Sequence, residues 1–212
     1  YKVNRRMFDL LAAHDFSMRD AIRADMAQHG PWNLVQAKPN EYVDIIEVED
    51  LLRVHDLLIP SMELVLEGDV DPGAHVRGPV HLGEGSHVHA GAVIRGPVHI
   101  GKHCDIGPGA VLLPGASVRN RTRIGPLTVL SRCSIGSNVT IGSHGRIEDC
   151  VIDNGASLGS YAHVQASSGA IVGADAILGD RVTVESGAVI GRGARVVDGR
   201  RVHDVPDAGQ AV

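Results

Sequence analysis

Aliphatic residues recur at every sixth position over a long stretch of the chain, from Val70 to Leu130. This period differs from the 3.6-residue period of an amphipathic helix and from the two-residue alternation of a half-buried strand. It is typical of a six-residue unit that contains one short strand and one turn. The aliphatic positions are Val70, Val76, Leu82, Val88, Ile94, Ile100, Ile106, Leu112, Val118, Ile124 and Leu130.

A second repeat, of 18 residues, supports the first. The segment Arg77–Gly83 reads Arg-Gly-Pro-Val-His-Leu-Gly, and Arg95–Gly101 repeats it with Ile in place of Leu. Three six-residue units make one triangular coil, and parallel strands of successive coils stack about 4.8 Å apart. We therefore expect a mainly β fold, a hexapeptide-repeat parallel β-helix whose interior holds the sixth-position aliphatic residues.

The repeat continues beyond Leu130, with two one-residue deletions and one two-residue insertion at 165–170. This gives about 23 units in all. Four residues after most of the aliphatic positions stands a second small or β-branched residue, as at Ser86, Thr122 and Thr128. These residues are expected to complete the interior.

The first sixty residues follow a different pattern and predict a small α/β segment. Ser17 is a candidate N-cap for a helix that runs to about Ala27, before Gly30. The other expected elements are a helix at Met7–Ala13, strands at Asn33–Ala37 and Glu41–Ile46, and a helix at Val48–Leu58. The expected organisation is thus an α/β segment at 1–60, a β-helix at 61–204 and a tail at 205–212.

Composition narrows the classes of partner. A net charge of −5 without a basic face argues against nucleic-acid binding. No apolar run reaches the ~20 residues needed to span a membrane, and no secretory signal is visible, so a cytoplasmic location is expected. The first residue is Tyr rather than Met, which suggests upstream chain. Cys104, Cys133 and Cys150 are expected to be reduced thiols, the last two as neighbours on adjacent coils.

The run from Tyr42 to His55 resembles the end of the catalytic domain of sugar-1-phosphate nucleotidylyltransferases, such as glucose-1-phosphate thymidylyltransferase and N-acetylglucosamine-1-phosphate uridylyltransferase. Tyr1–Leu11 and Ser17–Ile22 are similar to segments that precede it in that family. The resemblance implies a left-handed β-helix, a homotrimer, and nucleotide and sugar phosphate bound by an upstream domain. It also implies Mg²⁺ held with the help of Asp44.

The resemblance further implies that the β-helix is a candidate acyltransferase, with acetyl-CoA between adjacent prisms and a histidine as general base. Ser160 occupies the position of the family's histidine, so His163 and His144 are the nearest candidate bases. The alternative is that both are surface histidines. Arg119, Arg121 and Arg123 are candidates for CoA or nucleotide phosphates, or else belong to a solvated edge.

His81 and His99 lie one coil apart, so they are expected to stack, with Arg77 and Arg95 beside them. Stacked histidines suggest a metal site as in γ-class carbonic anhydrases, but the third histidine is missing, since His103 follows His99 by four residues rather than five. Three hypotheses remain open: a nucleotidylyltransferase part whose prism also transfers acyl groups, a non-catalytic oligomerisation and regulatory module, and a metal-dependent lyase.

Overall fold

The structure is a computed structural model that describes residues 18–29 and 63–207, apart from the side chains of 18, 19 and 166–168. The chain divides into two units, Tyr1–Tyr42 and Val43–Val212, which are described separately. The other elements predicted for the first sixty residues, and Asp44, lie outside the described residues. In the described part of the chain, no helix is long and apolar enough to cross a membrane.

Helix α2 (Met18–His29) is the described part of the first unit. It confirms the helix predicted to follow Ser17, and it ends directly before Gly30. Asp20 lies in its first turn and His29 in its last, where acidic and basic groups respectively favour the helix dipole.

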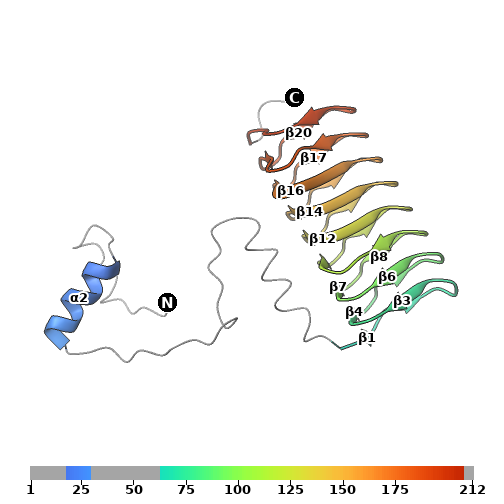
Figure 1. Ribbon diagram of the computed structural model, residues 1–212. Helices are drawn as coiled ribbons and strands as arrows, with labels where there is room; N and C mark the ends of the chain where they lie inside the picture. The colour runs from blue at the N-terminus through green and yellow to red at the C-terminus, as the bar shows by residue number, and fades with distance from the viewer. Residues whose placement is uncertain (1–17, 30–62, 208–212) are drawn as a thin grey trace. The chain divides into compact units, whose positions relative to one another are not determined.

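The second unit is a parallel β-solenoid of stacked coils, which confirms the predicted fold class (Figure 1). One face is an eight-stranded sheet, called sheet B here, in the order β2-β5-β8-β11-β13-β15-β17-β20. Its strands are β2 (Asp69–Val70), β5 (His87–Val88), β8 (Asp105–Ile106), β11 (Arg123–Ile124), β13 (Thr140–Ile141), β15 (Ser157–Leu158), β17 (Ile177–Leu178) and β20 (Arg195–Val196).

The other two faces belong to one 13-stranded sheet, because three long strands continue around a corner and contribute to both. The long strands are β12 (Val129–Ile135), β14 (Arg146–Ile152) and β16 (His163–Val172). One face also contains β1 (Val65–Leu66), β4 (Val80–Leu82), β7 (Val98–Ile100), β10 (Ala116–Val118) and β19 (Val189–Ile190). The other also contains β3 (His75–Arg77), β6 (Val93–Arg95), β9 (Val111–Leu112), β18 (Thr183–Val184) and β21 (Arg201–Val202).

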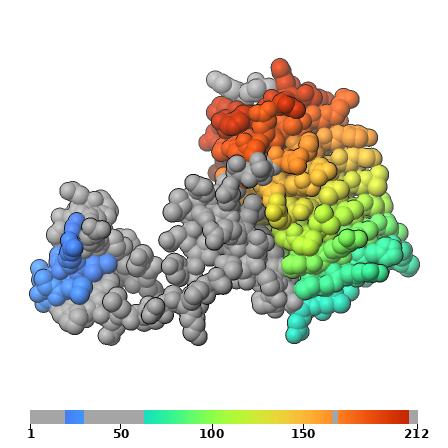
Figure 2. Space-filling model, viewed as in Figure 1, coloured from blue at the N-terminus to red at the C-terminus, as the bar shows by residue number. Residues whose placement is uncertain are grey.

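The strand register confirms the predicted deletions and insertion. Val118 pairs with Ile135, and Ile135 with Ile152, so each of these coils is one residue shorter than 18. Ile152 then pairs with Val172, two residues beyond the regular spacing. A strand continues through a corner in both shortened coils and also in the lengthened one, and Figure 2 shows that the coils remain stacked in sequence.

The interior of the prism contains the predicted aliphatic residues. From Leu82 to Val202 the inward residues are buried, while Val70 and Val76 in the first coil are partly buried. Ser86, Thr122 and Thr128, at the small-residue positions, are also buried. The Ser86 hydroxyl donates to the Gly101 carbonyl at 2.7 Å and accepts from the Cys104 N–H at 2.8 Å. The hydroxyl residues therefore satisfy backbone groups of the next coil that the strands leave unpaired.

The corners of the coils hold residues in the left-handed backbone region, where non-glycine residues are uncommon. In one column, the glycines of early coils are followed by Leu127, His144, Tyr161 and Arg181, all with φ between 55° and 59°. The side chains of this column therefore project at an edge of the prism rather than from a face.

Candidate functional site

The predicted bases His163 and His144 occupy different settings. His163 lies in β16, and its Nε2 is 3.2 Å from Oε1 of Gln165. His144 lies in the corner column, where its ring stacks on Tyr161 with the centroids 4.7 Å apart. Within the described residues, neither histidine is paired with a carboxylate, and no hydrogen bond or ring contact joins the two. Their catalytic role stays a prediction.

The three candidate phosphate-binding arginines are distributed around one corner. Arg119 follows β10 and lines a surface cavity of about 400 Å³ together with His99 and Ser117. Arg121 lies at the corner with φ 58°, and Arg123 lies in β11, where its Nε donates to Asp105 Oδ2 at 3.2 Å. The arginines therefore do not converge on one cavity, and their role in cofactor binding stays a prediction.

The predicted stack of His81 and His99 is present. Their ring centroids are 5.0 Å apart with an interplanar angle of 12°, and Arg77 is in register with Arg95. The Nδ1 atom of His81 is buried and has no hydrogen-bond partner among the described residues. No carboxylate of the described chain forms an ion pair with His81.

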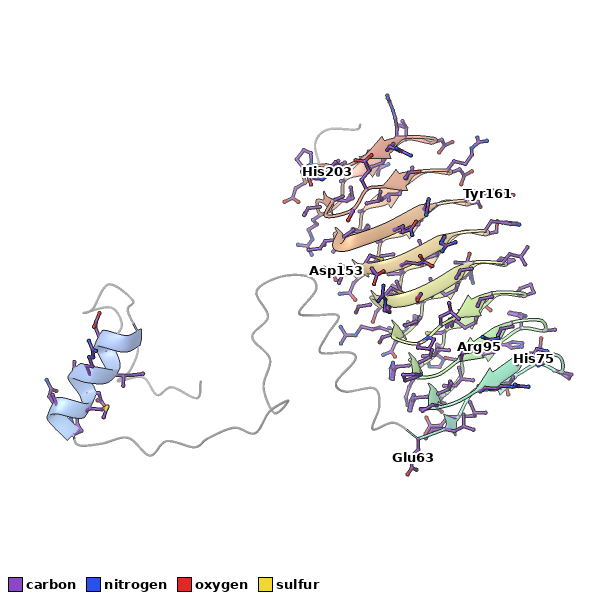
Figure 3. The ribbon with its side chains drawn as sticks, viewed as in Figure 1. Glu63, His75, Arg95, Asp153, Tyr161 and His203 are labelled. Carbon is purple, nitrogen blue, oxygen red and sulfur yellow. The ribbon has the colours of Figure 1, made fainter. Side chains whose placement is uncertain are left out.

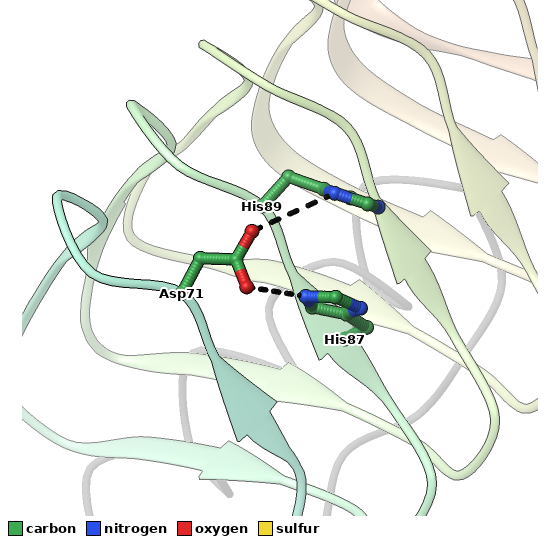
Figure 4. Close-up of side chains that lie close together, drawn as sticks. All are labelled: Asp71, His87 and His89. Carbon is green, nitrogen blue, oxygen red and sulfur yellow. Dashed lines mark hydrogen bonds and ion pairs between the residues drawn. The ribbon is translucent and has the colours of Figure 1, made fainter.

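A second pair of histidines, which the sequence analysis did not single out, lies on sheet B beside two carboxylates. His87 and His89 flank the inward Val88, and their rings stack with the centroids 4.3 Å apart. The carboxylate of Asp71 lies beside the stacked rings, with one oxygen toward a nitrogen of each imidazole (Figure 4). We call Asp71, His87 and His89 the Asp–His–His cluster.

The contacts of this cluster include two hydrogen bonds between a histidine and a carboxylate and one longer ion pair. Asp71 Oδ1 is 2.8 Å from His87 Nε2, and Asp71 Oδ2 is 3.8 Å from His89 Nδ1. Asp71 Oδ2 also accepts the Ala90 N–H at 3.2 Å. On the far side of the ring, His89 Nε2 is 2.7 Å from Asp105 Oδ1. His89 is thus held between two carboxylates, one on the preceding coil and one on the following coil.

The two partners shift each other's proton affinity. The hydrogen bond that Asp71 accepts from His87 raises the pKa of His87, because the carboxylate stabilises the imidazolium. The same bond lowers the pKa of Asp71. The 18-residue period places these residues on neighbouring coils, since Asp71 lies one coil before His89 and His87 one coil before Asp105, but both short contacts join residues 16 positions apart.

A cavity of about 540 Å³ lies beside β3 and β6 and is lined by Arg77, Arg95 and His75, with Gly78 and Gly96 at its edge. Figure 3 places His75 and Arg95 on the same side of the solenoid. Neither arginine forms an ion pair with an acidic residue in the described part of the chain. The cavity is therefore positively charged, and it is suited to an anionic group.

The cysteines do not supply a nucleophile at neutral pH. All three are buried and free, and Cys133 pairs in register with Cys150, as predicted. Burial raises the pKa of Cys133 to about 12 and that of Cys150 well above its ordinary value, so both remain thiols. Burial also raises the pKa of Cys104.

Among solved structures, the chain is similar to several acyltransferases. The UDP-N-acetylglucosamine acyltransferase LpxA from Bacteroides fragilis is 17% identical, with 69% of this chain and 71% of that chain covered and a TM-score of 0.49. A GDP-perosamine N-acetyltransferase variant from Caulobacter crescentus, in complex with CoA and GDP-perosamine, is 26% identical, with 68% and 51% covered and a TM-score of 0.32.

A hexapeptide transferase family protein from Anaplasma phagocytophilum is 25% identical, with 66% and 71% covered and a TM-score of 0.30. No protein of curated function gives a significant match. One family model matches residues 94–205, which is more than half of the chain. The chain therefore belongs to the GMPPB C-terminal domain family, a left-handed β-helix of sugar nucleotidyltransferases.

Proposed function

We propose that this chain is the β-helical C-terminal part of a sugar-1-phosphate nucleotidylyltransferase, and that the solenoid holds copies of the enzyme together as a homotrimer. The observation that carries the proposal is the family match over residues 94–205. In this proposal the described solenoid is an assembly module, and nucleotidyl transfer takes place elsewhere in the enzyme.

The corner column supports contact with a second copy of this chain. Leu127 is 53% exposed and Tyr161 is 57% exposed, and His144 stacks on Tyr161 in the same column. Exposed apolar and aromatic side chains of this kind are enriched at interfaces between protein chains. A projecting edge of one triangular prism fits against a neighbouring prism.

The mass of the chain in solution, measured by light scattering after size exclusion, tests this assembly. The expected value is near three times 22.4 kDa. Tyr161→Asp and Leu127→Asp are expected to give single chains, because each buries a charge at the interface. Val189→Asp, at an exposed residue on a face of the prism, is the control and is expected to remain a trimer. A single-chain mass for the unaltered protein overturns the proposal.

Nucleotidyl transfer itself needs a magnesium site that one carboxylate cannot form. Mg²⁺ takes an octahedral set of carboxylate, phosphate and water oxygens. Asp44 is the candidate ligand in this chain, and it stands outside the described residues. When bound, Mg²⁺ neutralises charge on the nucleotide phosphates, and Asp44 would be one carboxylate among several that position it.

A second function, acyl transfer from acetyl-CoA to a sugar, is favoured by the cavity that His75, Arg77 and Arg95 line. Two arginines without acidic partners would pair with the phosphates of CoA, and a histidine within the same cavity is a candidate general base. His163 and His144 also stay candidates for that base. In that case a neighbouring prism would complete the site.

Calorimetric titration with acetyl-CoA tests this second function. Binding is expected for the unaltered chain, and the double variant Arg77→Ala with Arg95→Ala is expected to lose it. Arg195→Ala, at an exposed position of β20 outside the corner column, is a matched control that removes one positive charge elsewhere. If acetyl-CoA at millimolar concentration produces no heat, the acyl-transfer function is wrong and the assembly function stands alone.

A further inference from the structure

We propose that the Asp–His–His cluster on sheet B is a binding site for a divalent transition metal such as zinc, with Asp71, His87 and His89 as its three protein ligands. One ligand atom from each residue lies within 4.8 Å of the others. Its ligands are neither the exposed side chains of the corner column nor the residues that line the cavity at Arg77 and Arg95, so the site does not depend on the functions proposed above.

The spacing of the ligand atoms fits tetrahedral coordination. Zinc binds imidazole nitrogen at about 2.0 to 2.1 Å and carboxylate oxygen at about 2.0 to 2.2 Å, so ligand atoms around it lie about 3.3 to 3.5 Å apart. Asp71 Oδ1 is 2.8 Å from His87 Nε2, and Asp71 Oδ2 is 3.8 Å from His89 Nδ1. One distance is shorter and the other longer than the required value, and the three ligand atoms lie within 4.8 Å of one another, so side-chain rotation must bring them to tetrahedral spacing.

Asp105 and Arg123 support the ligand His89 from behind. In metal sites, a histidine ligand usually bonds a carboxylate through its other ring nitrogen, which fixes the tautomer and the orientation of the ring. Here Asp105 Oδ1 is 2.7 Å from His89 Nε2, which leaves Nδ1 directed toward Asp71. Arg123 Nε in turn donates to Asp105 Oδ2 at 3.2 Å.

The backbone that positions the ligands is rigid. Val88 lies between the two histidines, is fully buried, and pairs in register with Val70 and Ile106. The carboxylate of Asp71 is fixed from the other side by the Ala90 N–H at 3.2 Å. Ligands on two stacked coils are therefore placed before any metal arrives, which limits the entropy lost on binding.

The ligand set predicts which metals bind and how many coordination positions stay open. Two imidazoles and one carboxylate suit zinc and its neighbours in the first transition row, whereas magnesium and calcium prefer oxygen ligands alone. Three protein ligands leave a fourth position for water, as in catalytic rather than structural zinc sites. All three side chains are partly exposed, so that position opens to solvent.

Zinc titration of the chelator-treated chain tests the site, with a fluorescent zinc chelator as competitor and Co²⁺ absorption as a second measurement. The cluster is expected to bind one zinc ion per chain and to give the visible bands of four-coordinate Co²⁺. Asp71→Asn and His87→Asn are expected to remove binding at concentrations that saturate the unaltered chain. Asp105→Asn, which leaves all three ligands in place, is expected to weaken binding by about 10- to 100-fold.

His203→Asn is the matched control, because it removes another histidine that contacts a carboxylate, Asp204, at 2.9 Å outside the cluster. It is expected to leave zinc affinity unchanged, and circular dichroism verifies that every variant keeps the β fold. If the chain binds no zinc, or if Asp71→Asn and His87→Asn bind zinc as tightly as the unaltered chain, the proposal is wrong. In that case the cluster is a hydrogen-bonded charge network only.

Discussion

Val88 and His87 are neighbours in β5, yet Val88 belongs to the interior of the prism and His87 to its outer face, and the two regions differ in which residues they accept. Val88 points into the prism, where its neighbours on the adjacent coils are Val70 and Ile106. His87 points outward on sheet B, where its register neighbours are the charged residues Asp69 and Asp105. The interior repeats one chemistry at every coil, while the outer face changes from coil to coil.

This difference separates what holds the solenoid together from what gives it a site. An interior residue stabilises the fold through apolar area removed from water, so any residue of suitable size and shape serves. On the outer face, side chains of successive coils form ladders whose members contact one another across about 4.8 Å. Outward residues can therefore be replaced by residues that form a binding site, while the interior residues stay aliphatic.

The largest expected effect comes from opening a cavity in the interior. Ile100→Ala and Ile106→Ala, at two fully buried positions, are each expected to lower the free energy of unfolding by about 2 to 5 kcal/mol. Urea denaturation followed by circular dichroism measures this loss. Because Ile106 adjoins Asp105 and Ile100 does not, only Ile106→Ala is expected to weaken zinc binding as well. Equal zinc affinity in the two variants would contradict this and would show that packing at Ile106 does not influence the zinc site.

Alkaline pH is expected to destabilise the interior through its thiols. Burial raises the pKa of Cys133 from 9.0 to about 12, so the folded chain keeps a proton that the unfolded chain releases. The stabilisation is fully present below pH 9 and is lost as the pH rises toward 12. The loss is of the order of 4 kcal/mol, since one pKa unit corresponds to about 1.4 kcal/mol.

Urea denaturation at pH 8 and pH 11 measures this dependence. Cys133→Ala is the comparison, because it removes the titrating thiol and leaves lysine, arginine and tyrosine residues unchanged. The alanine variant is expected to lose less stability between the two pH values than the unaltered chain. If both lose the same amount, the thiol of Cys133 does not contribute to the pH dependence.

The buried hydroxyl of Ser86 is expected to contribute less than a large aliphatic side chain. Ser86→Ala leaves the Gly101 carbonyl and the Cys104 N–H without their partner, which costs about 1 to 3 kcal/mol. Thermal unfolding measures the loss. Ser86→Thr is the control, because Thr122 and Thr128 already make equivalent bonds at corresponding positions, and it is expected to keep most of the stability.

The interior could be predicted from sequence almost completely, and the outer face only in part. A six-residue period fixes which residues point inward, and Ile94, Ile106 and Leu112 are buried as expected. The stack of His81 on His99 was also predictable, because the same residue recurs after 18 positions and parallel strands in register place equivalent residues side by side.

The Asp–His–His cluster was harder to predict because its contacts are diagonal and join different residues. His87 is in register with Asp69, but its hydrogen bond goes to Asp71, two residues further along the earlier coil. Side-chain rotamers decide between such alternatives, and a periodic pattern carries no information about them. The stack of His144 on Tyr161 joins two different residues across a shortened coil, so no repeat of one residue type marks it in the sequence.

The smallest expected effect is at the outer edge of the proposed zinc site. Arg123→Ala removes an exposed ion pair with Asp105, and such pairs contribute about 0 to 1 kcal/mol to stability. Zinc affinity is nevertheless expected to fall, by less than for Asp105→Asn, because Asp105 keeps its contact with His89 but loses one of the groups that orient it.

Parallel zinc titrations and melting curves of Arg123→Ala and Arg195→Ala test this. Arg195 occupies the corresponding outward position on a later coil of sheet B, away from the site, so its removal is expected to change neither quantity. A loss of zinc affinity at Arg123 without a loss of stability would show that the outer face can be altered independently of the interior that supports it.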